Sequence, residues 1–244
     1  MTRTDCHAYF LAMLPENKQD SQPRSFIEAA RRAQIVESAI AVIAEVGYAN
    51  TSMARIARRA GISRGLISYH FSGKDELIAQ VLVTVYAEGG AFMEPRVTAE
   101  TTAAGQLRAY IQSNIDYMRA HPERMVAVVD IISGGALADE GLGVDLATAE
   151  EQSLAPLLEI FRRGQEGGEF RRFDPRTMAR AVRSVIDAIP PHISEPGLDL
   201  AACAHELTTL FDLATRSPQA ATGVRGAAVV ADAAEARDVA GERA

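Results

Sequence analysis

Residues 53–71 read MARIARRAGISRGLISYHF, and this spacing predicts two short helices that cross at a tight turn. The small side chain of Ala57 lets the second helix approach the first, and Gly61 permits a turn conformation that is closed to bulkier residues. Ile62 and Ile67 then fill the angle between the helices. An ordinary corner inside a helical core has the same pattern, but it has no use for guanidinium groups, and this stretch holds Arg55, Arg58, Arg59 and Arg64. The pattern therefore favours a helix-turn-helix that faces a polyanion.

The charge of the chain is divided unevenly along its length. The net charge of the whole chain is −7, which by itself argues against nucleic acid as a partner. Residues 24–74, however, hold eight basic and three acidic side chains, a net charge of +5, so the other residues together hold −12. This asymmetry predicts a basic part that meets DNA and an acidic body with another task.

Composition predicts an all-α protein. Hydrophobic residues make up 48% of the chain, but only 6% of it is aromatic and there is no Trp, which is typical of helical proteins rich in Ala and Leu. The two cysteines, Cys6 and Cys203, lie far apart and form no close pair of the kind found at metal sites. The sequence shows neither a convincing signal peptide nor about 18 successive apolar residues. We therefore expect a soluble, cytoplasmic protein with no membrane contact, metal or cofactor.

Periodicity predicts helices throughout the middle of the chain. A first helix has its apolar face at residues 35–46 and ends at Gly47, and two short helices follow at 53–60 and 64–70. A fourth begins near Lys74 and continues toward Phe92, and later helices are expected at 100–119, 122–134, 146–166, 175–189 and 198–216. Residues 1–24 and 218–244 are predicted to be disordered tails. Between them we expect a DNA-binding domain at 25–74 and a helical body at 75–217.

Residues 32–77 resemble the TetR/AcrR family of transcriptional regulators. They contain an amphipathic helix ending in Gly47-Tyr48, then Thr51, then IARRAGISRGLISYHF at 56–71, and finally KDEL at 74–77. The resemblance implies an N-terminal three-helix helix-turn-helix domain and a C-terminal helical domain for ligand binding and dimerisation. Leu66 and Ser68 differ from the residues that many members of the family have at these positions, so the base preferences of those members do not apply to this chain.

The resemblance also implies which residues contact DNA. The third helix becomes the recognition helix in the major groove, and Arg64 is our choice for reading a base, because a guanidinium can bind O6 and N7 of guanine together. A phosphate contact is the alternative for Arg64. The phosphate contacts that position the protein are expected from Thr51, Ser52, Tyr69, His70 and Lys74. The full predicted DNA-binding set is Thr51, Ser52, Arg55, Ser63, Arg64, Gly65, Ser68, Tyr69, His70 and Lys74.

For the body, the resemblance implies a small-molecule pocket and a dimer interface built from the last two long helices. Apolar stripes in these helices fit an interface, although a stripe is usually core: Met178, Val182, Val185, Ile186 and Ile189 in one, and Leu200, Cys203, Leu207, Leu210, Phe211 and Ala214 in the other. The predicted ligand-binding residues are Phe92, Met93, Tyr110, Asn114, Tyr117, Met125, Asp130 and Phe161. For any one of them, ordinary packing is the alternative.

The function expected from these features is ligand-responsive regulation of transcription. The chain should bind an inverted-repeat operator in double-stranded DNA as a homodimer, repress transcription, and release the operator when a small-molecule effector binds. A constitutive or architectural DNA-binding protein without a ligand is the alternative. An enzyme is disfavoured, because the five histidines are scattered and no G-x-S-x-G, P-loop or H-E-x-x-H motif occurs.

Overall fold

The computed structural model describes residues 26–134 and 146–218, and the predicted tails lie almost entirely outside these ranges. Within them the chain is helical and no strand occurs apart from one isolated bridge between Phe170 and Arg216. The all-α prediction is confirmed. The elements are α2 (Phe26–Val46), α3 (Met53–Ala60), α4 (Arg64–His70), α5 (Lys74–Thr98), α6 (Ala103–Ala120), α7 (Pro122–Ser133), α8 (Leu146–Glu166), α9 (Pro175–Asp187), the 3-10 turn η2 (Pro190–His192) and α10 (Leu200–Thr215).

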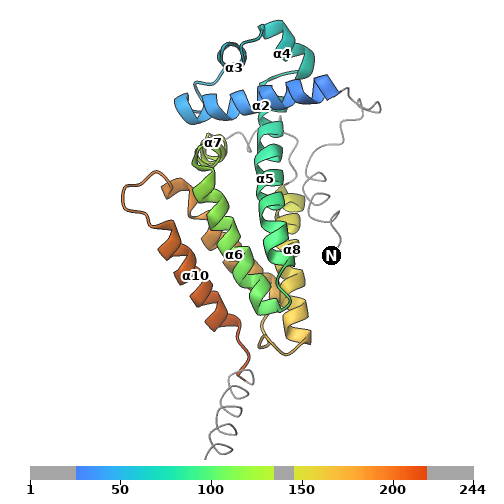
Figure 1. Ribbon diagram of the computed structural model, residues 1–244, viewed down its shortest axis with the longest axis vertical. Coiled ribbons are helices and arrows are strands. Elements are labelled where there is room, and N and C mark those ends of the chain that lie inside the picture. Colours follow the sequence, from blue (N-terminus) through green and yellow to red (C-terminus); the bar gives the residue numbers. More distant parts are fainter. Residues whose placement is uncertain (1–25, 135–145, 219–244) are drawn as a thin grey trace, which may run out of the picture.

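Helices α2, α3 and α4 form a headpiece at one end of the molecule, and α5 runs from it into the body (Figure 1). Helix α2 lies across the end of α5 and packs against α7 as well as against α3. The body consists of α5 to α10, with α6 in contact with α5, α8, α9 and α10. The predicted domain boundary at residue 74 therefore coincides with the start of the helix that both parts share.

Several helix boundaries differ from those that the sequence predicts, and α2, α5 and α9 show the reasons. Helix α2 begins at Phe26, ahead of its apolar face, because residues 26–34 are rich in Ala, Arg and Gln, which favour helix even when exposed. Helix α5 continues through Pro95 to Thr98, so the proline removes one backbone donor close to the end of the helix without ending it. Helix α9 ends at Asp187, and the two prolines that follow form η2 instead of extending it.

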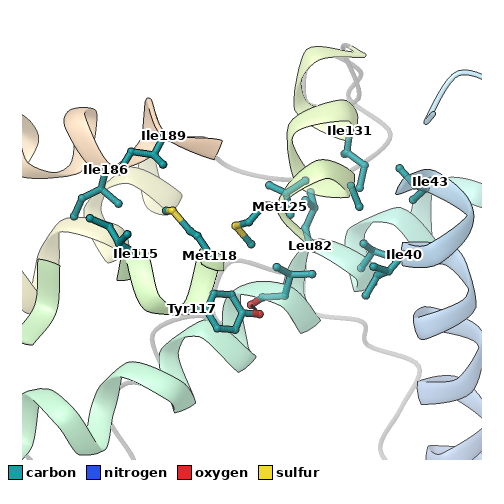
Figure 2. Close-up of a cluster of buried hydrophobic side chains, with 14 of the residues drawn as sticks. Ile40, Ile43, Leu82, Ile115, Tyr117, Met118, Met125, Ile131, Ile186 and Ile189 are labelled. Atoms are coloured by element: carbon teal, nitrogen blue, oxygen red, sulfur yellow. Dashed lines mark hydrogen bonds between the residues drawn. The ribbon is translucent and has the colours of Figure 1, made fainter. Parts of the chain in front are cut away.

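A continuous band of buried apolar side chains joins the headpiece to the body. Figure 2 shows Ile40 and Ile43 of α2 facing Leu82 of α5 and Ile131 of α7, with Met125 next in the same band. The band continues through Met118 and Ile115 of α6 to Ile186 and Ile189. Protein interiors are close-packed and resist local compression. The headpiece is therefore held against the body by core packing as well as by the covalent link through α5.

Candidate nucleic-acid interface and ligand site

The turn between α3 and α4 has the conformation that the sequence predicts. Gly61 ends α3 with φ +67°, a left-handed conformation that costs glycine little and other residues more. Ser63 begins α4, and its side chain accepts a hydrogen bond from the Leu66 N–H at 3.2 Å. Ile56 and Ile67 are completely buried where the two helices meet. The helix-turn-helix is confirmed.

One face of α4 is turned to solvent. Its exposed residues follow the i, i+1, i+4, i+5 spacing of a helical face, and they are Arg64, Gly65, Ser68 and Tyr69; the capping residue Ser63 is exposed as well. Tyr69 leaves 72% of its surface exposed, and its hydroxyl donates to Glu28 Oε1 over 3.3 Å. A large exposed aromatic with a polar tip is suited to a contact with another molecule.

The arginines around α4 fall into two groups. Arg59 is paired with Glu45, whose carboxylate lies 3.0 Å from its guanidinium. Arg55, Arg58 and Arg64 are exposed, and within residues 26–134 and 146–218 no salt bridge to them is found. Their positive charge therefore faces outward beside the recognition helix, where a phosphate backbone would neutralise it.

Three residues predicted as phosphate contacts are buried, half-buried or hydrogen-bonded inside the headpiece. Thr51 is buried, and its hydroxyl donates to the Gly47 carbonyl over 2.8 Å. The ammonium of Lys74 donates to the Tyr48 carbonyl over 2.9 Å and lies 4.0 Å from the centre of the Tyr48 ring. Burial lowers the pKa of Lys74, with Asp75 acting in the opposite direction. His70 is half-buried. Thr51 and Lys74 thus position the loop between α2 and α3.

Ser52 has a different task, because it caps the N-terminus of α3. It begins α3, and its side-chain oxygen accepts a hydrogen bond from the Arg55 N–H at 3.3 Å. The residue remains exposed at the start of the helix. A helix N-terminus with an exposed hydroxyl is a favourable place for a phosphate.

Asp130, which the sequence predicts as a ligand-binding residue, lies where α7 meets α2. Its carboxylate accepts a hydrogen bond from the Tyr48 N–H, and a Cβ on Gly47 would lie 3.4 Å from the same carboxylate. The acid therefore holds the end of α2 against α7, at the junction between headpiece and body. The sequence shows only an acid within an apolar helix, and it cannot distinguish the face of α7 that meets α2 from the face that meets α6.

A second polar contact at this junction involves Arg124, which sequence reasoning missed. Its Nε lies 2.6 Å from Glu88 of α5, and its Nη2 lies 2.8 Å from Glu37 of α2. The hydrogen bond to Glu88 raises the pKa of Arg124. Tyr117 lies beside this group and donates its hydroxyl to the Val85 carbonyl over 3.0 Å. Arg124 therefore joins three helices that belong to both parts of the molecule.

The predicted ligand-binding residues form separate groups in the body. Tyr110, Asn114 and Tyr117 are all buried on the inner face of α6. Tyr117 contacts the ring of Phe92, with 5.6 Å between ring centres, whereas Tyr110 and Asn114 face Arg183 of α9.

The other three lie in other surroundings. Met125 belongs to the apolar band described above, and Met93 is half-buried on α5. Phe161 packs against Phe170 and Phe173, with ring centres 6.0 and 5.3 Å apart. The ligand assignment of this set remains a prediction.

The apolar stripe of α9 lies mostly inside the protomer, whereas that of α10 is buried only in part. Val182 and Ile186 of α9 are completely buried, and Phe211 of α10 is buried as well. Leu210 belongs to the stripe of α10 but leaves 54% of its surface open, and the neighbouring Leu213 leaves 64% open. Much of the α9 stripe is therefore core, and the exposed leucines of α10 are available for an interface.

Two further features concern membranes and metals. Within the described ranges no helix is long and apolar enough to cross a membrane. The same residues contain no group of three or more His, Cys, Asp or Glu side chains placed to hold a metal ion.

Comparison with known proteins agrees with the geometry of the headpiece. Residues 35–81 match the family model for bacterial regulatory proteins of the tetR family. The HTH-type transcriptional regulator BetI of Cronobacter sakazakii is 27% identical over 169 residues, which cover 68% of this chain and 81% of that protein. BetI of Pectobacterium carotovorum is 34% identical over 96 residues, so this chain spans 49% of the length of that relative.

Solved structures share the fold of the whole molecule. The ketosteroid transcriptional regulator KstR2 of Mycobacterium tuberculosis matches with a TM-score of 0.60 and 21% identity, covering 80% of this chain and 97% of that one. AibR, solved in complex with isovaleryl coenzyme A and operator DNA, matches with a TM-score of 0.62 and 20% identity over 74% of this chain and 97% of that one. Together with the helix-turn-helix geometry, the match of residues 35–81 identifies the headpiece as that of bacterial regulatory proteins of the tetR family, in a chain that is similar to HTH-type transcriptional regulators.

Proposed function

We propose that this regulator is a homodimeric repressor that binds an inverted-repeat operator and releases it when a small-molecule effector binds. The observation that carries the proposal is the exposed face of α4, where Arg64, Ser68 and Tyr69 point to solvent beside the exposed Arg55 and Arg58. This face has the size and charge to enter a major groove.

The side chains of the headpiece divide into two kinds of DNA contact. Arg64 stands at the first position of α4, the end of a recognition helix that reaches base edges, and its guanidinium can bind a guanine through two hydrogen bonds. Arg55 and Arg58 lie on α3 and supply phosphate contacts, which fix the register of the protein without reading sequence. Ser52 and Tyr69 add hydrogen bonds at the edges of the groove.

Dimerisation is supported by the outward faces of the last two long helices. Leu210 and Leu213 of α10 are exposed, and the exposed positions of α9 include the small residues Ala181 and Ser184, with Ala188 directly after the helix. Small residues let two helices approach closely, and exposed leucines gain from burial in a partner. A twofold pairing of these faces gives one interface and two recognition helices, which is why we expect a palindromic operator.

Release by an effector is supported by the body and by a structural relative. AibR was solved with isovaleryl coenzyme A and operator DNA, so a protein of this fold can hold both a small molecule and DNA. A ligand releases DNA only to the extent that it prefers the geometry that does not bind DNA. In this chain α5 and the α2–α7 contacts connect the two parts.

The proposal is tested by footprinting the full-length protein on the DNA adjoining its own gene, followed by selection of preferred sites from a random library. We expect one inverted repeat, with affinity that falls steeply as salt rises. Arg64→Ala should relax the preference at one base pair of each half-site and cost about 1–3 kcal/mol there.

Arg59→Ala is the matched control, because Arg59 is equally charged but paired with Glu45. Its base preference should stay that of the wild type. A footprint without twofold symmetry would contradict the dimeric mode, and an unchanged preference in Arg64→Ala would make that residue a phosphate contact.

A further inference from the structure

The body contains a largely buried arginine that sequence reasoning overlooked. Arg183 of α9 leaves only 17% of its side chain exposed. Its Nη1 donates to the Tyr110 hydroxyl oxygen over 3.2 Å and to Asn114 Oδ1 over 3.3 Å, and both partners lie on α6. The Asn114 amide is itself fixed, because its Nδ2 donates to the Tyr110 carbonyl over 2.8 Å. Its oxygen therefore points steadily toward the guanidinium.

One donor of this guanidinium is unused. Arg183 Nε is buried and has no hydrogen-bond partner, and among the residues that the structure describes the only other such side-chain atom is Gln152 Oε1. Gln152 belongs to α8, the helix that packs against both α6 and α9. Native proteins satisfy nearly all buried polar groups, so an orphaned N–H on a charged side chain calls for a partner. A bound molecule would supply one.

The occupied donors indicate the shape of that partner. The Nη2 group of Arg183 contacts Asp187 Oδ1, one turn further along α9. Nη2 and Nε form the edge of a guanidinium that binds both oxygens of one carboxylate through two parallel hydrogen bonds. Asp187 uses only half of this edge, and 58% of its side chain is exposed to solvent. It can therefore turn into water and leave the whole edge to another carboxylate.

The surroundings match a molecule with one acidic end and an apolar remainder. Ile111 and Ile115 flank Asn114 along α6 and are buried, and Ile186 follows Arg183 along α9 (Figure 2 shows Ile115 beside Ile186). A doubly charged phosphate would be repelled by Asp187 more strongly than a single carboxylate would.

We propose that Arg183, with Tyr110 and Asn114, binds the carboxylate of a small apolar acid, and that this acid displaces Asp187 from the guanidinium. The inference rests on the proposed function, because it names the chemical class of the effector. Tyr110 and Asn114 hold the guanidinium in place, and Asp187 occupies the site as a substitute anion when no acid is bound.

The test compares acids with neutral molecules of the same shape. Octanoate, octanamide, benzoate, benzamide and inorganic phosphate are titrated into the full-length protein by calorimetry, with thermal shift as a second readout. We expect at least one acid to bind at least tenfold more tightly than its amide, and phosphate not to compete with it. If no acid binds, or if amides bind as well as acids, the proposal is overturned.

Three variants locate the effect. Arg183→Lys keeps the charge but loses the pair of parallel hydrogen bonds to the carboxylate, so acid binding should weaken about 10- to 100-fold. Arg180→Lys is the matched control, since Arg180 lies on the same helix, is exposed and pairs with Glu150; its acid affinity should be unchanged. Asp187→Asn removes the competing carboxylate and should raise acid affinity several-fold. An Asp187→Asn protein that binds acids more weakly, or an Arg183→Lys protein that binds them normally, would refute the displacement.

Operator binding, measured in the same samples, separates this inference from the proposed function. Release of operator by amides and acids alike would support the proposed ligand-responsive function and refute the carboxylate site. Acids that bind through Arg183 without changing operator affinity would support the site and refute its role as effector site.

Discussion

The clearest quantitative consequence of the structure concerns Asp130, whose carboxylate holds the Tyr48 N–H at the junction of α7 and α2. Replacing Asp130 by Ala removes the acceptor and leaves that N–H without its partner. The carbonyl of the same residue stays bound, because Lys74 donates to it. The loop should therefore loosen without unfolding.

The expected size follows from the type of hydrogen bond. Bonds to charged groups contribute about 1.5–3 kcal/mol, and Asp130 is only half-buried, so we expect the free energy of unfolding to fall by about 1.5–2 kcal/mol. For a chain of this length that corresponds to a decrease in Tm of roughly 3–8 °C. Hydrogen exchange at the Tyr48 amide should accelerate at least tenfold, since this amide loses its acceptor.

Two variants make the measurement decisive. Asp130→Asn retains an acceptor oxygen and should recover part of the loss, whereas Glu123→Ala changes an exposed acid on the same helix and should stay within about 0.5 kcal/mol of wild type. If Asp130→Ala melts like wild type and the Tyr48 amide stays protected from exchange, the hydrogen bond from Tyr48 to Asp130 does not hold α2 against α7. If that variant instead loses effector binding alone, the pocket expected from the sequence is the better assignment.

Three other substitutions test the interface, the turn and the junction with α5. Leu213→Glu should raise the dimer dissociation constant at least about 100-fold, because each dimer loses two buried leucines, while Leu198→Glu, outside α10, should leave sedimentation unchanged. Gly61→Ala should lower the free energy of unfolding by about 1 kcal/mol in thermal melts, since the new methyl group meets nothing within 4 Å and only the left-handed backbone is penalised. Burial of Glu76 would raise its pKa, but hydrogen bonds from Ser72 and the charge of Arg32 outweigh burial and lower it from 4.5. The stabilisation that ionised Glu76 gives the folded state is therefore complete above about pH 4.5, and it is lost as pH falls through the lowered pKa of the folded state. In urea titrations between pH 6 and 3, the free energy of unfolding of Glu76→Gln should therefore fall less with acid than that of the wild type.

The elements could be predicted because their signals are local. Ser52 and Ser63 stand at helix starts, Gly47 and Gly61 stand at helix ends, and the apolar spacing between them is helical. Caps and turns act within a few residues, so the sequence displays them directly. The beginning of α2 at Phe26 was missed, because that turn has no apolar stripe and is helical by propensity alone.

The contacts between elements could not be predicted in the same way. An apolar stripe shows that a face is buried but not in what: Val182 and Ile186 of the α9 stripe pack into the protomer, whereas Leu210 of the α10 stripe is exposed. Arg124 and Arg183 were overlooked for a related reason. Each is an ordinary helical arginine in the sequence, and only the packing of other helices brings Glu88 to the first and Tyr110 to the second.

These overlooked contacts also suggest how the body communicates with the headpiece. Tyr110, Asn114 and Tyr117 share the inner face of α6, so an acid bound at Arg183 meets the same helix that supports Tyr117. Tyr117 lies 3.5 Å from Glu88, the acid that pairs with Arg124, and Arg124 pairs with Glu37 in the headpiece.

A displacement of α6 therefore has a polar route to α2 in addition to the covalent route along α5. Close packing makes such routes stiff, because a core changes between discrete arrangements rather than deforming continuously. The two recognition helices of a dimer must meet successive major grooves about 34 Å apart, so a small rotation of α2 at this junction is enough to misalign one of them.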